Sequence, residues 1–397
     1  MCEGKMKKPN LLKIIEEETA AAGDDVISWR RQFHKYPELG FEEYKTSAKV
    51  KNVLKKAGIP FKIMAKTGVV GYMEKGADIT VGLRADMDAL PVEEKTGLPF
   101  ASVNKGVMHA CGHDGHTAVL LGVAKVLKKL EKHLNVNVRL IFQPCEEKPP
   151  GGASVMIKEG VLKGIDYLMG FHFFPTMPMY KLWFGVGSVM ATTDFFHITV
   201  KGKGGHGSAP ELTKDPVICS AAIIEGLQTI VSRNISPLKP AVISVCKISG
   251  GDAYNIIPET VELGGTVRTL DDMIRDRIKT EMENKISAIA RGFGCAAKMS
   301  YDSYSLACIN DRKLTTLLEH LTRDMFSRRN ITDFHPVMGG EDFAFFSRKV
   351  PSSYLFVGIG DRYGTNHNNN FSIDEKVLPY TVNLFSALIL HFPAASF

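Results

Sequence analysis

An alternation of apolar strand-like and helix-like segments is the feature that most constrains the fold of this 397-residue chain. The segment "ITVGLRADMDALP" (79–91) has the apolar run of a buried strand that ends in polar residues, and "VNVRLIFQP" (136–144) is a second such strand. Between them, "TAVLLGVAKVLKKL" (117–130) has the wide apolar face of a helix. This alternation predicts an α/β class with a mostly parallel sheet, whose sites lie at the strand ends.

A different order of predicted strands and helices begins near residue 188 and indicates an inserted domain. Its expected elements are a strand in "FFHITVKGKGGHGSAP", a helix over 216–233 capped by Asp215, strands over 241–249 and 257–268, a helix over 271–292 and a strand near 296–301. The order βαββαβ is that of a ferredoxin-like α+β fold. We therefore predict a discontinuous catalytic domain, 1–187 and 303–397, and an inserted domain, 188–302.

The composition of the chain limits the classes of binding partner and the cellular compartment that we expect for it. Charged residues make up 23% of the chain and the net charge is +6, with Lys and Arg spread along it, so no nucleic-acid partner is expected. Seven scattered cysteines without a C-x-x-C pair are typical of a reduced, cytoplasmic protein. The first apolar stretch is interrupted by Lys13 and three glutamates, and no apolar run approaches a membrane span, so neither a signal peptide nor a membrane segment is expected.

The stretch "MHACGHDGH" is the densest concentration of candidate metal ligands. Cys111 and His113 are two residues apart, which places both side chains on one side of an extended segment, so we favour them as ligands. His113 and His116 would share a helix face only if the helix began as early as Asp114, and we expect His109 and His116 to have supporting roles. The competing interpretation is a polar turn that caps the following helix, with Asp114 as its N-cap.

Further chemistry-bearing groups occur downstream: Cys145-Glu146-Glu147 after a strand, His172, Glu341-Asp342 and His367. A mixed set of imidazole, carboxylate and thiolate suits zinc, or a similar ion such as manganese or nickel, better than calcium or magnesium. In water-activating metal hydrolases one carboxylate binds the metal while another takes the proton of the water. Adjacent residues such as Glu146 and Glu147 can point apart in a loop and divide these two roles.

These motifs allow two other interpretations. Cys111 as a nucleophile paired with a histidine is disfavoured, because no known protease signature surrounds it. "GKGGHG" matches the dinucleotide pattern G-x-G-x-x-G, but such a loop must open directly into a helix, and "SAP" (208–210) and a further loop intervene here. A flexible loop that presents His206 fits this segment better.

Five motifs in order along the chain carry a family resemblance. They are "RRQFHKYPELGFEE" (30–43), "RADMDALP" (84–91), "MHACGHDGHTA" (108–118), "GGHGSAP" (204–210) and "GGEDFAFF" (339–346). In these motifs the chain resembles the amidohydrolase branch of the M20 metallopeptidase family. That branch includes hippurate hydrolases, N-acyl-amino-acid amidohydrolases, N-acetyldiaminopimelate deacetylases and the plant hydrolases of auxin conjugates.

The resemblance implies a di-metal aminopeptidase-like catalytic domain and an inserted lid domain, through which members commonly form homodimers. It implies two divalent ions per subunit, zinc, manganese, nickel or cobalt, and a set of ligands that correspond here to Cys111, His113, Glu147, His172 and His367. Glu146 corresponds to the general base and Asp86 to a carboxylate that orients the centre. His206, Asn255 and Arg268 correspond to groups for the scissile carbonyl oxygen and the substrate carboxylate.

The implied reaction is hydrolysis of the amide bond of an N-acyl amino acid, a small-molecule substrate, by a metal-activated water with Glu146 as base. A carboxypeptidase or dipeptidase on the same scaffold is the alternative enzyme. A catalytically silent metal-binding or ligand-binding protein is a third possibility, against which an intact Glu146 argues. The chain departs from the family pattern at "KPPGG" (148–152), at Cys145, and in the polar flanks of His367 in "TNHNNNFSIDE".

Overall fold

The computed structural model describes residues 11–326, 328–362 and 364–395. The first ten residues, with which the predicted catalytic domain begins, lie outside these ranges. The chain divides into two compact units, of which the first comprises 1–187, 309–335 and 345–397 and the second 188–308 and 336–344. Residues 303–308 and 336–344, which the sequence analysis assigned to the catalytic domain, belong to the second unit. Contacts between segments distant in sequence place 336–344 there, and such contacts leave no local sequence signal.

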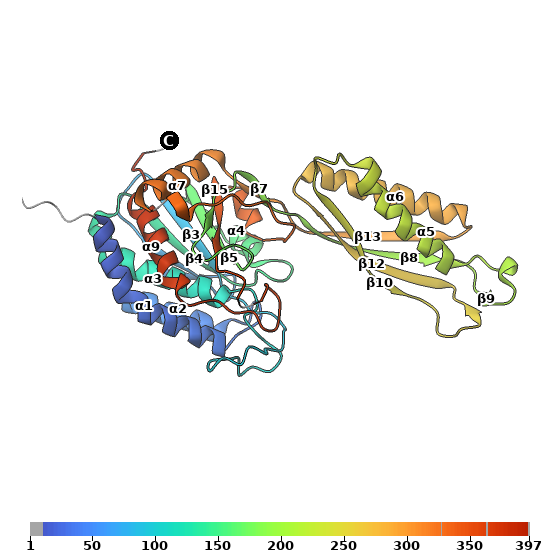
Figure 1. Ribbon diagram of the computed structural model, residues 1–397, viewed down its shortest axis with the longest axis horizontal. Coiled ribbons are helices and arrows are strands. Elements are labelled where there is room, and N and C mark those ends of the chain that lie inside the picture. The colour runs from blue at the N-terminus through green and yellow to red at the C-terminus, as the bar shows by residue number, and fades with distance from the viewer. Residues whose placement is uncertain (1–10, 327, 363, 396–397) are drawn as a thin grey trace, which may run out of the picture. The chain divides into compact units, whose positions relative to one another are not determined.

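Unit 1 is built on a seven-stranded mixed sheet (Figure 1). The spatial order is β1 (Phe61–Met64), β2 (Gly68–Met73), β4 (Asn137–Gln143), β3 (Thr80–Asp86), β5 (Tyr167–Phe174), β15 (Ser352–Gly358) and β6 (Leu182–Trp183). The four strands β4, β3, β5 and β15 are mutually parallel, and β1, β2 and β6 join antiparallel. Every residue of β3 is buried, which explains its continuous apolar run. The predicted α/β class is confirmed.

Helices cover this sheet and supply most of the core of unit 1. They are α1 (Leu11–Lys35), α2 (Tyr44–Lys56), α3 (His113–Lys129), α4 (Gly152–Lys158), α7 (Arg312–Met325), α8 (Ala344–Ser347) and α9 (Val377–Leu390), with single turns at Glu131–His133 and Arg328–Asn330. The apolar helix α3 packs against α1 and α9 and is buried over almost its whole length. Among the helices of the described ranges, none has both the length and the apolarity that crossing a membrane requires.

Helix α3 begins four residues earlier than the sequence analysis predicted. Its N-cap is Gly112, which has a left-handed backbone (φ 92°) that glycine adopts without strain. The interpretation of Asp114 as N-cap is therefore wrong, since Asp114 lies within the first turn and makes no capping hydrogen bond. His113 and His116 do share a helix face, and their ring centroids are 5.4 Å apart.

Unit 2 is a four-stranded antiparallel sheet with two helices across one face (Figure 1). Its elements in chain order are β8 (Thr193–Lys201), β9 (Gly205–His206), a turn at Pro210–Leu212, α5 (Pro216–Thr229), a π-helical turn at Ile230–Asn234, β10 (Ala241–Ser249), β11 (Ile256–Ile257), β12 (Thr260–Thr269), α6 (Asp272–Gly292) and β13 (Ala296–Ser305). The spatial order β10, β12, β8, β13 is ferredoxin-like, as predicted. The predicted cap of α5 is also confirmed, because the Asp215 carboxylate accepts hydrogen bonds from Val217 and Ile218. Where the chain passes between the units, β7 (Gly187–Met190) pairs with β14 (Cys308–Asn310).

Candidate metal centre

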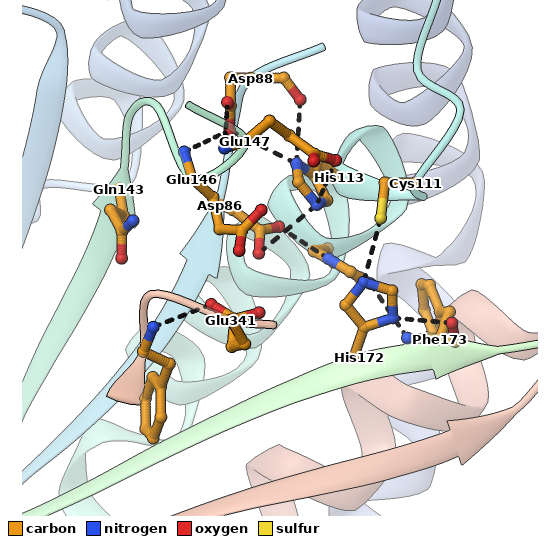
Figure 2. Close-up of polar contacts among 12 residues, drawn as sticks. Asp86, Asp88, Cys111, His113, Gln143, Glu146, Glu147, His172, Phe173 and Glu341 are labelled. Atoms are coloured by element: carbon orange, nitrogen blue, oxygen red, sulfur yellow. Dashed lines mark hydrogen bonds and ion pairs between the residues drawn. The ribbon is translucent and has the colours of Figure 1, made fainter. Parts of the chain in front are cut away.

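The carboxyl ends of three neighbouring parallel strands position the candidate site of unit 1 (Figure 2). Asp86 is the last residue of β3 and lies opposite Gln143, the last residue of β4, so the loop with Glu146 and Glu147 emerges at this edge. His172 lies near the end of β5. Helix α3 starts at the same edge with His113. Strand register therefore brings together side chains that are distant in sequence.

Two histidines of this edge have their rings fixed by backbone carbonyls. His172 Nδ1 lies 2.8 Å from the carbonyl oxygen of Phe173, and His113 Nδ1 lies 2.9 Å from that of Asp88 (Figure 2). Since a carbonyl only accepts, each Nδ1 is the donating nitrogen, and each ring turns its Nε2 away from that carbonyl. His172 Nε2 lies 3.3 Å from Cys111 Sγ, whereas His113 Nε2 has no hydrogen-bond partner among the described residues.

The remaining two predicted ligands approach the same point from other loops. Glu147 Oε1 lies 3.9 Å from His113 Nε2 and 3.3 Å from His367 Nε2. His367 adopts a left-handed backbone (φ 64°) in the loop after β15, and its N–H donates to the carbonyl of Ala110 at 2.7 Å. The polar neighbour Asn366 donates to the carbonyl of Cys111 at 3.3 Å. The unusual polar flank thus tethers His367 to the "HACGH" loop.

All five predicted ligands therefore meet in overlapping groups whose donor atoms lie within 4.8 Å of one another. These groups are Cys111, His113 and His172; Cys111, Glu147 and His367; and His113, Glu146 and Glu147. Thiolate, imidazole and carboxylate are the donor set of zinc and related ions. The buried Nε2 of His113, which lacks a hydrogen bond within the described ranges, is the kind of atom that a bound cation satisfies. The residues present fit a metal centre.

The pKa shifts of the predicted ligands are also those expected of a metal centre. Burial lowers the pKa of His172 well below its usual value, so this imidazole is neutral and able to coordinate. Burial also acts to lower the pKa of His113, but the charges of Asp86 and Cys111 outweigh it and raise that pKa. Hydrogen bonds to Cys111 and Glu147 raise the pKa of His367 to about 10. In the absence of metal, protons on His113 and His367 balance the negative groups that a cation would otherwise balance.

Asp88, which the sequence analysis did not single out, fixes the backbone of the glutamate pair. Its Oδ1 accepts the N–H of Glu146 at 2.9 Å, and its Oδ2 accepts that of Glu147 at 3.0 Å (Figure 2). Its carbonyl also holds His113, as described above. A detectable signal existed: "RADMDALP" has two aspartates two residues apart, a spacing that puts both on one side of an extended segment.

Asp86 has a different position from Asp88. Its carboxylate is fully buried, pairs with Arg84 Nη1 at 2.6 Å and His116 Nδ1 at 2.7 Å, and lies 3.8 Å from His113 Nε2. Burial alone would raise the pKa of Asp86, but the charges of His113 and Arg84 and the hydrogen bond from His116 outweigh it and hold the pKa well below its usual range. His116 Nε2 also accepts the N–H of Phe173 at 3.1 Å. With both ring nitrogens engaged, His116 supports the site instead of binding metal.

A buried network below the start of α3 was also missed from the sequence. Asp114 Oδ2 accepts from Arg30 Nε at 2.9 Å and lies 2.8 Å from His34 Nδ1, while His34 Nε2 lies 3.1 Å from Glu94. Burial raises the pKa of Asp114, but Arg30 and His34 outweigh it and hold that pKa far below its usual range. The arginine and the histidine both belong to the "RRQFHKYPELGFEE" motif, which thereby anchors the first turn of the helix that carries His113.

His109, predicted to have a supporting role, is fully buried in unit 1. Neither of its ring nitrogens has a hydrogen-bond partner among the described residues. Burial lowers the pKa of His109 to about 4, so its ring is neutral. It contributes packing volume beside Asp114 and no charge.

The predicted substrate-binding residues all lie in unit 2. His206 on β9 pairs with Ile256 of β11, and the N–H of Gly207 donates to the carbonyl of Asn255 at 2.8 Å, so His206 and Asn255 are held together. Arg268 lies on β12, where its Nε donates to Thr266 at 3.2 Å and its Nη1 to Thr193. Glu341 and Asp342 are also in unit 2 and are buried, and Glu341 accepts the N–H of Phe343 at 2.9 Å.

Comparison with known proteins places the chain in a family. The model of peptidase family M20/M25/M40 matches residues 82–391. The chain belongs to peptidase family M20. Thermostable carboxypeptidase 1 of Saccharolobus solfataricus is 40% identical over 93% of this chain and 95% of its own length. N-acetyl-L-cysteine deacetylase of Bacillus subtilis is 40% identical over 89% of this chain and 84% of its own.

A solved structure extends the likeness to three dimensions. A Bacillus subtilis protein, described as a dinuclear metal binding peptidase from the M20 family, superposes with a TM-score of 0.82 and 32% identity over 94% of this chain and 98% of that one. Family membership confirms the resemblance drawn from the five motifs. It also confirms the enzyme class: this M20 chain is a metal-dependent hydrolase of amides or peptides.

Proposed function

We propose that this M20 hydrolase cleaves the amide bond of N-acyl amino acids and releases a carboxylic acid and a free amino acid. The observation that carries the proposal is the arrangement of the glutamate pair. Asp88 accepts both backbone N–H groups of the pair, and Glu147 extends towards His113 and His367. Glu146, one residue earlier and buried at the same edge, is the separate carboxylate that such a reaction needs.

Cys111, His113, Glu147, His172 and His367 would hold two divalent ions, such as zinc, manganese, nickel or cobalt. When bound, these ions would supply Lewis-acid polarisation of the amide carbonyl and a lowered pKa for the attacking water. Glu146 accepts the proton of that water and delivers it to the leaving nitrogen. Asp86 accepts from His116 and lies beside His113. Asp88 holds His113 and the backbone of Glu146, so the two aspartates orient the ligand and the base.

Groups of unit 2 would bind the amino-acid part of the substrate. His206 Nδ1 accepts from the backbone of Ser208 at 3.2 Å, which leaves Nε2 for a carbonyl oxygen. Asn255, held beside His206, offers amide donors. Arg268 is half-buried, and burial lowers its pKa, an unfavourable situation for a cation that a bound carboxylate would relieve. Its planar guanidinium suits a carboxylate, which it can bind through two parallel hydrogen bonds.

A panel of substrates tests this proposal. N-acetyl, N-benzoyl and indoleacetyl amino acids would be assayed with metal-reconstituted enzyme, with the chelated enzyme, and with Glu146→Gln. We expect hydrolysis that chelation abolishes, and a loss of about 10²–10⁴-fold in kcat for Glu146→Gln with metal content retained, as for removal of a general base. Full activity in a metal-free preparation, or no cleavage of any N-acyl amino acid by the reconstituted enzyme, would reject the proposal.

A carboxypeptidase is the second candidate, favoured by the 40% identical relative of that name. A carboxypeptidase substrate is a peptide, which differs from a simple N-acyl amino acid in the residues that extend beyond the scissile bond. Three substrates with the same C-terminal residue, the peptides Gly-Phe and benzoyl-Gly-Phe and the N-acyl amino acid N-acetyl-Phe, separate the two functions. If kcat/KM for the peptides exceeds kcat/KM for N-acetyl-Phe by more than tenfold, the enzyme is a carboxypeptidase.

We also propose that unit 2 is the lid and mediates a cytoplasmic homodimer. Strand β10 is at one edge of the four-stranded sheet, and an edge strand presents backbone groups that can pair with another copy. It carries several exposed side chains, among them Ile248. Light scattering on the purified protein, compared with Ile248→Lys, tests this: a dimer that the substitution dissociates supports the proposal, and a monomer at micromolar concentration contradicts it.

A further inference from the structure

The loop that carries the glutamate pair is held through three consecutive backbone N–H groups. Two belong to Glu146 and Glu147 and donate to Asp88, as described above. The third belongs to Cys145, and it donates to Glu43 Oε1 at 2.8 Å. Glu43 comes from the "PELGFEE" segment and lies 102 residues before Cys145 in the sequence. Two carboxylates from separate segments thus accept every backbone N–H from Cys145 to Glu147.

The backbone at Cys145 needs such an anchor. Its φ is +50°, a left-handed conformation that costs a residue with a Cβ about 1–2 kcal/mol. The carbonyl of Cys145 also accepts the N–H of Gly152 at 2.7 Å, so both its peptide groups are bonded. Gly40 packs directly against this turn, since a Cβ added there would lie 2.6 Å from Cys145 Sγ. A turn held in this way sets the directions in which the next two side chains leave the backbone.

Glu43 is itself rigidly placed. Its carboxyl group is fully buried, and Thr67 Oγ1 donates to its Oε2 at 2.5 Å. Burial and the negative charge of Asp88 raise the pKa of Glu43 to about 7. A buried carboxyl group beside a second one destabilises the fold, which is an example of the trade-off between stability and activity at functional sites.

We infer that Glu43 is a positioning residue for hydrolysis: by accepting the Cys145 N–H, it fixes the loop that orients Glu146 as base and Glu147 as metal ligand. The inference rests on the proposed roles of these two glutamates. The Glu43 carboxyl group accepts from Thr67 and from the backbone of Cys145, and it acts on the site through that backbone. Thr67 positions Glu43 in turn.

The decisive comparison is between Glu43→Met, which removes the acceptor at similar side-chain length, and Glu38→Met. Glu38 belongs to the same segment and accepts from the backbone of Lys45 and Thr46, but not from the 145–147 loop. Amide hydrogen exchange of the metal-free proteins is the first measurement. We expect the Cys145 amide to exchange at least tenfold faster in Glu43→Met and at the wild-type rate in Glu38→Met. Equal protection of Cys145 in both variants would overturn the inference.

Steady-state kinetics at saturating metal supply the second measurement. In Glu43→Met, kcat should fall about tenfold or more while KM changes less than twofold, and Glu43→Gln, which keeps an acceptor oxygen, should restore most of kcat. A lower Tm with unchanged kcat would show that Glu43 is only structural. If Glu43→Met does not fold, Glu43→Asp withdraws the carboxylate by one methylene and serves in both measurements. If the wild type cleaves no N-acyl amino acid, the proposed function fails, yet the exchange comparison still decides whether Glu43 holds the loop.

Discussion

The Nε2 atom of His367 lies 3.3 Å from Oε1 of Glu147, and this contact closes the candidate metal centre from the C-terminal part of the chain. The side chain of His367 is 56% exposed, so its removal leaves no cavity in the core.

We therefore expect His367→Ala to lower metal content without a large change in fold. The substitution deletes one imidazole donor, and with incomplete ligation the bound metal should fall below the wild-type stoichiometry after dialysis, with kcat reduced at least tenfold. Elemental analysis and activity at saturating metal check this. His320→Ala, at an exposed histidine on α7, is the matched control and should keep wild-type metal content. Wild-type stoichiometry in His367→Ala would remove this residue from the ligand set.

A second prediction concerns Arg30 and Arg31, which both pair with Glu375. The Arg30 side chain is fully buried and also pairs with Asp114, whereas the Arg31 side chain is 51% exposed. Arg30→Met removes the guanidinium that neutralises the fully buried carboxylate of Asp114, so we expect the free energy of unfolding to fall by about 3–5 kcal/mol. Arg31→Met should cost less than about 1 kcal/mol, as exposed ion pairs do. Urea unfolding of both variants measures the difference, and equal losses would contradict the assigned burial.

The site illustrates what a sequence of this kind predicts and what it does not. Strand β3 and helix α3 were predictable because continuous apolar residues at the right spacing dictate them locally. The start of α3 was placed too late because Gly112 is a weak N-cap signal and the first-turn residues are polar. The five ligands came from the resemblance to M20 enzymes, since spacing alone identified only Cys111 and His113.

The contacts that hold the ligands could not be predicted in the same way. The spacing of Asp86 and Asp88 does not show which of them holds the glutamate loop, and only the hydrogen bonds of the folded chain assign that role to Asp88. The hydrogen bond from Cys145 to Glu43 joins segments far apart along the chain, and it depends on the left-handed turn at Cys145. Such contacts are products of tertiary packing, which a single sequence does not display.

A third prediction follows from the protons that occupy the metal-free centre. The pKa of His367 is about 10 and that of His113 is raised, so both rings are protonated near neutral pH, and metal binding must displace these protons. Apparent metal affinity should therefore rise with pH from 6 to 8, by about tenfold per unit for each proton released. Calorimetric titration in buffers of different ionisation enthalpy counts the protons. Affinity independent of pH would contradict the assigned protonation.

The last prediction uses the raised pKa of Glu43, about 7 in the folded protein against 4.5 as its ordinary value. The folded state holds the proton to higher pH than the unfolded state does, so the contribution of Glu43 to stability is lost as pH rises from about 4.5 to 7. The loss amounts to about 3 kcal/mol above pH 7, at about 1.4 kcal/mol per pKa unit. Glu43→Gln, which cannot ionise, should therefore be more stable than the wild type at pH 8 and show no advantage at pH 4.5.

Urea unfolding of the metal-free proteins between pH 4.5 and 8 measures this difference directly. Glu38→Gln, in the same segment, serves as the control, and its free energy of unfolding should change with pH in the same way as that of the wild type. A constant offset between Glu43→Gln and the wild type would mean that Glu43 ionises normally in the fold. If the stability difference between Glu43→Gln and the wild type grows with pH while the Cys145 amide of Glu43→Gln keeps its wild-type protection, two properties of Glu43 are separated. Its carbonyl oxygen holds the loop, and its negative charge opposes folding.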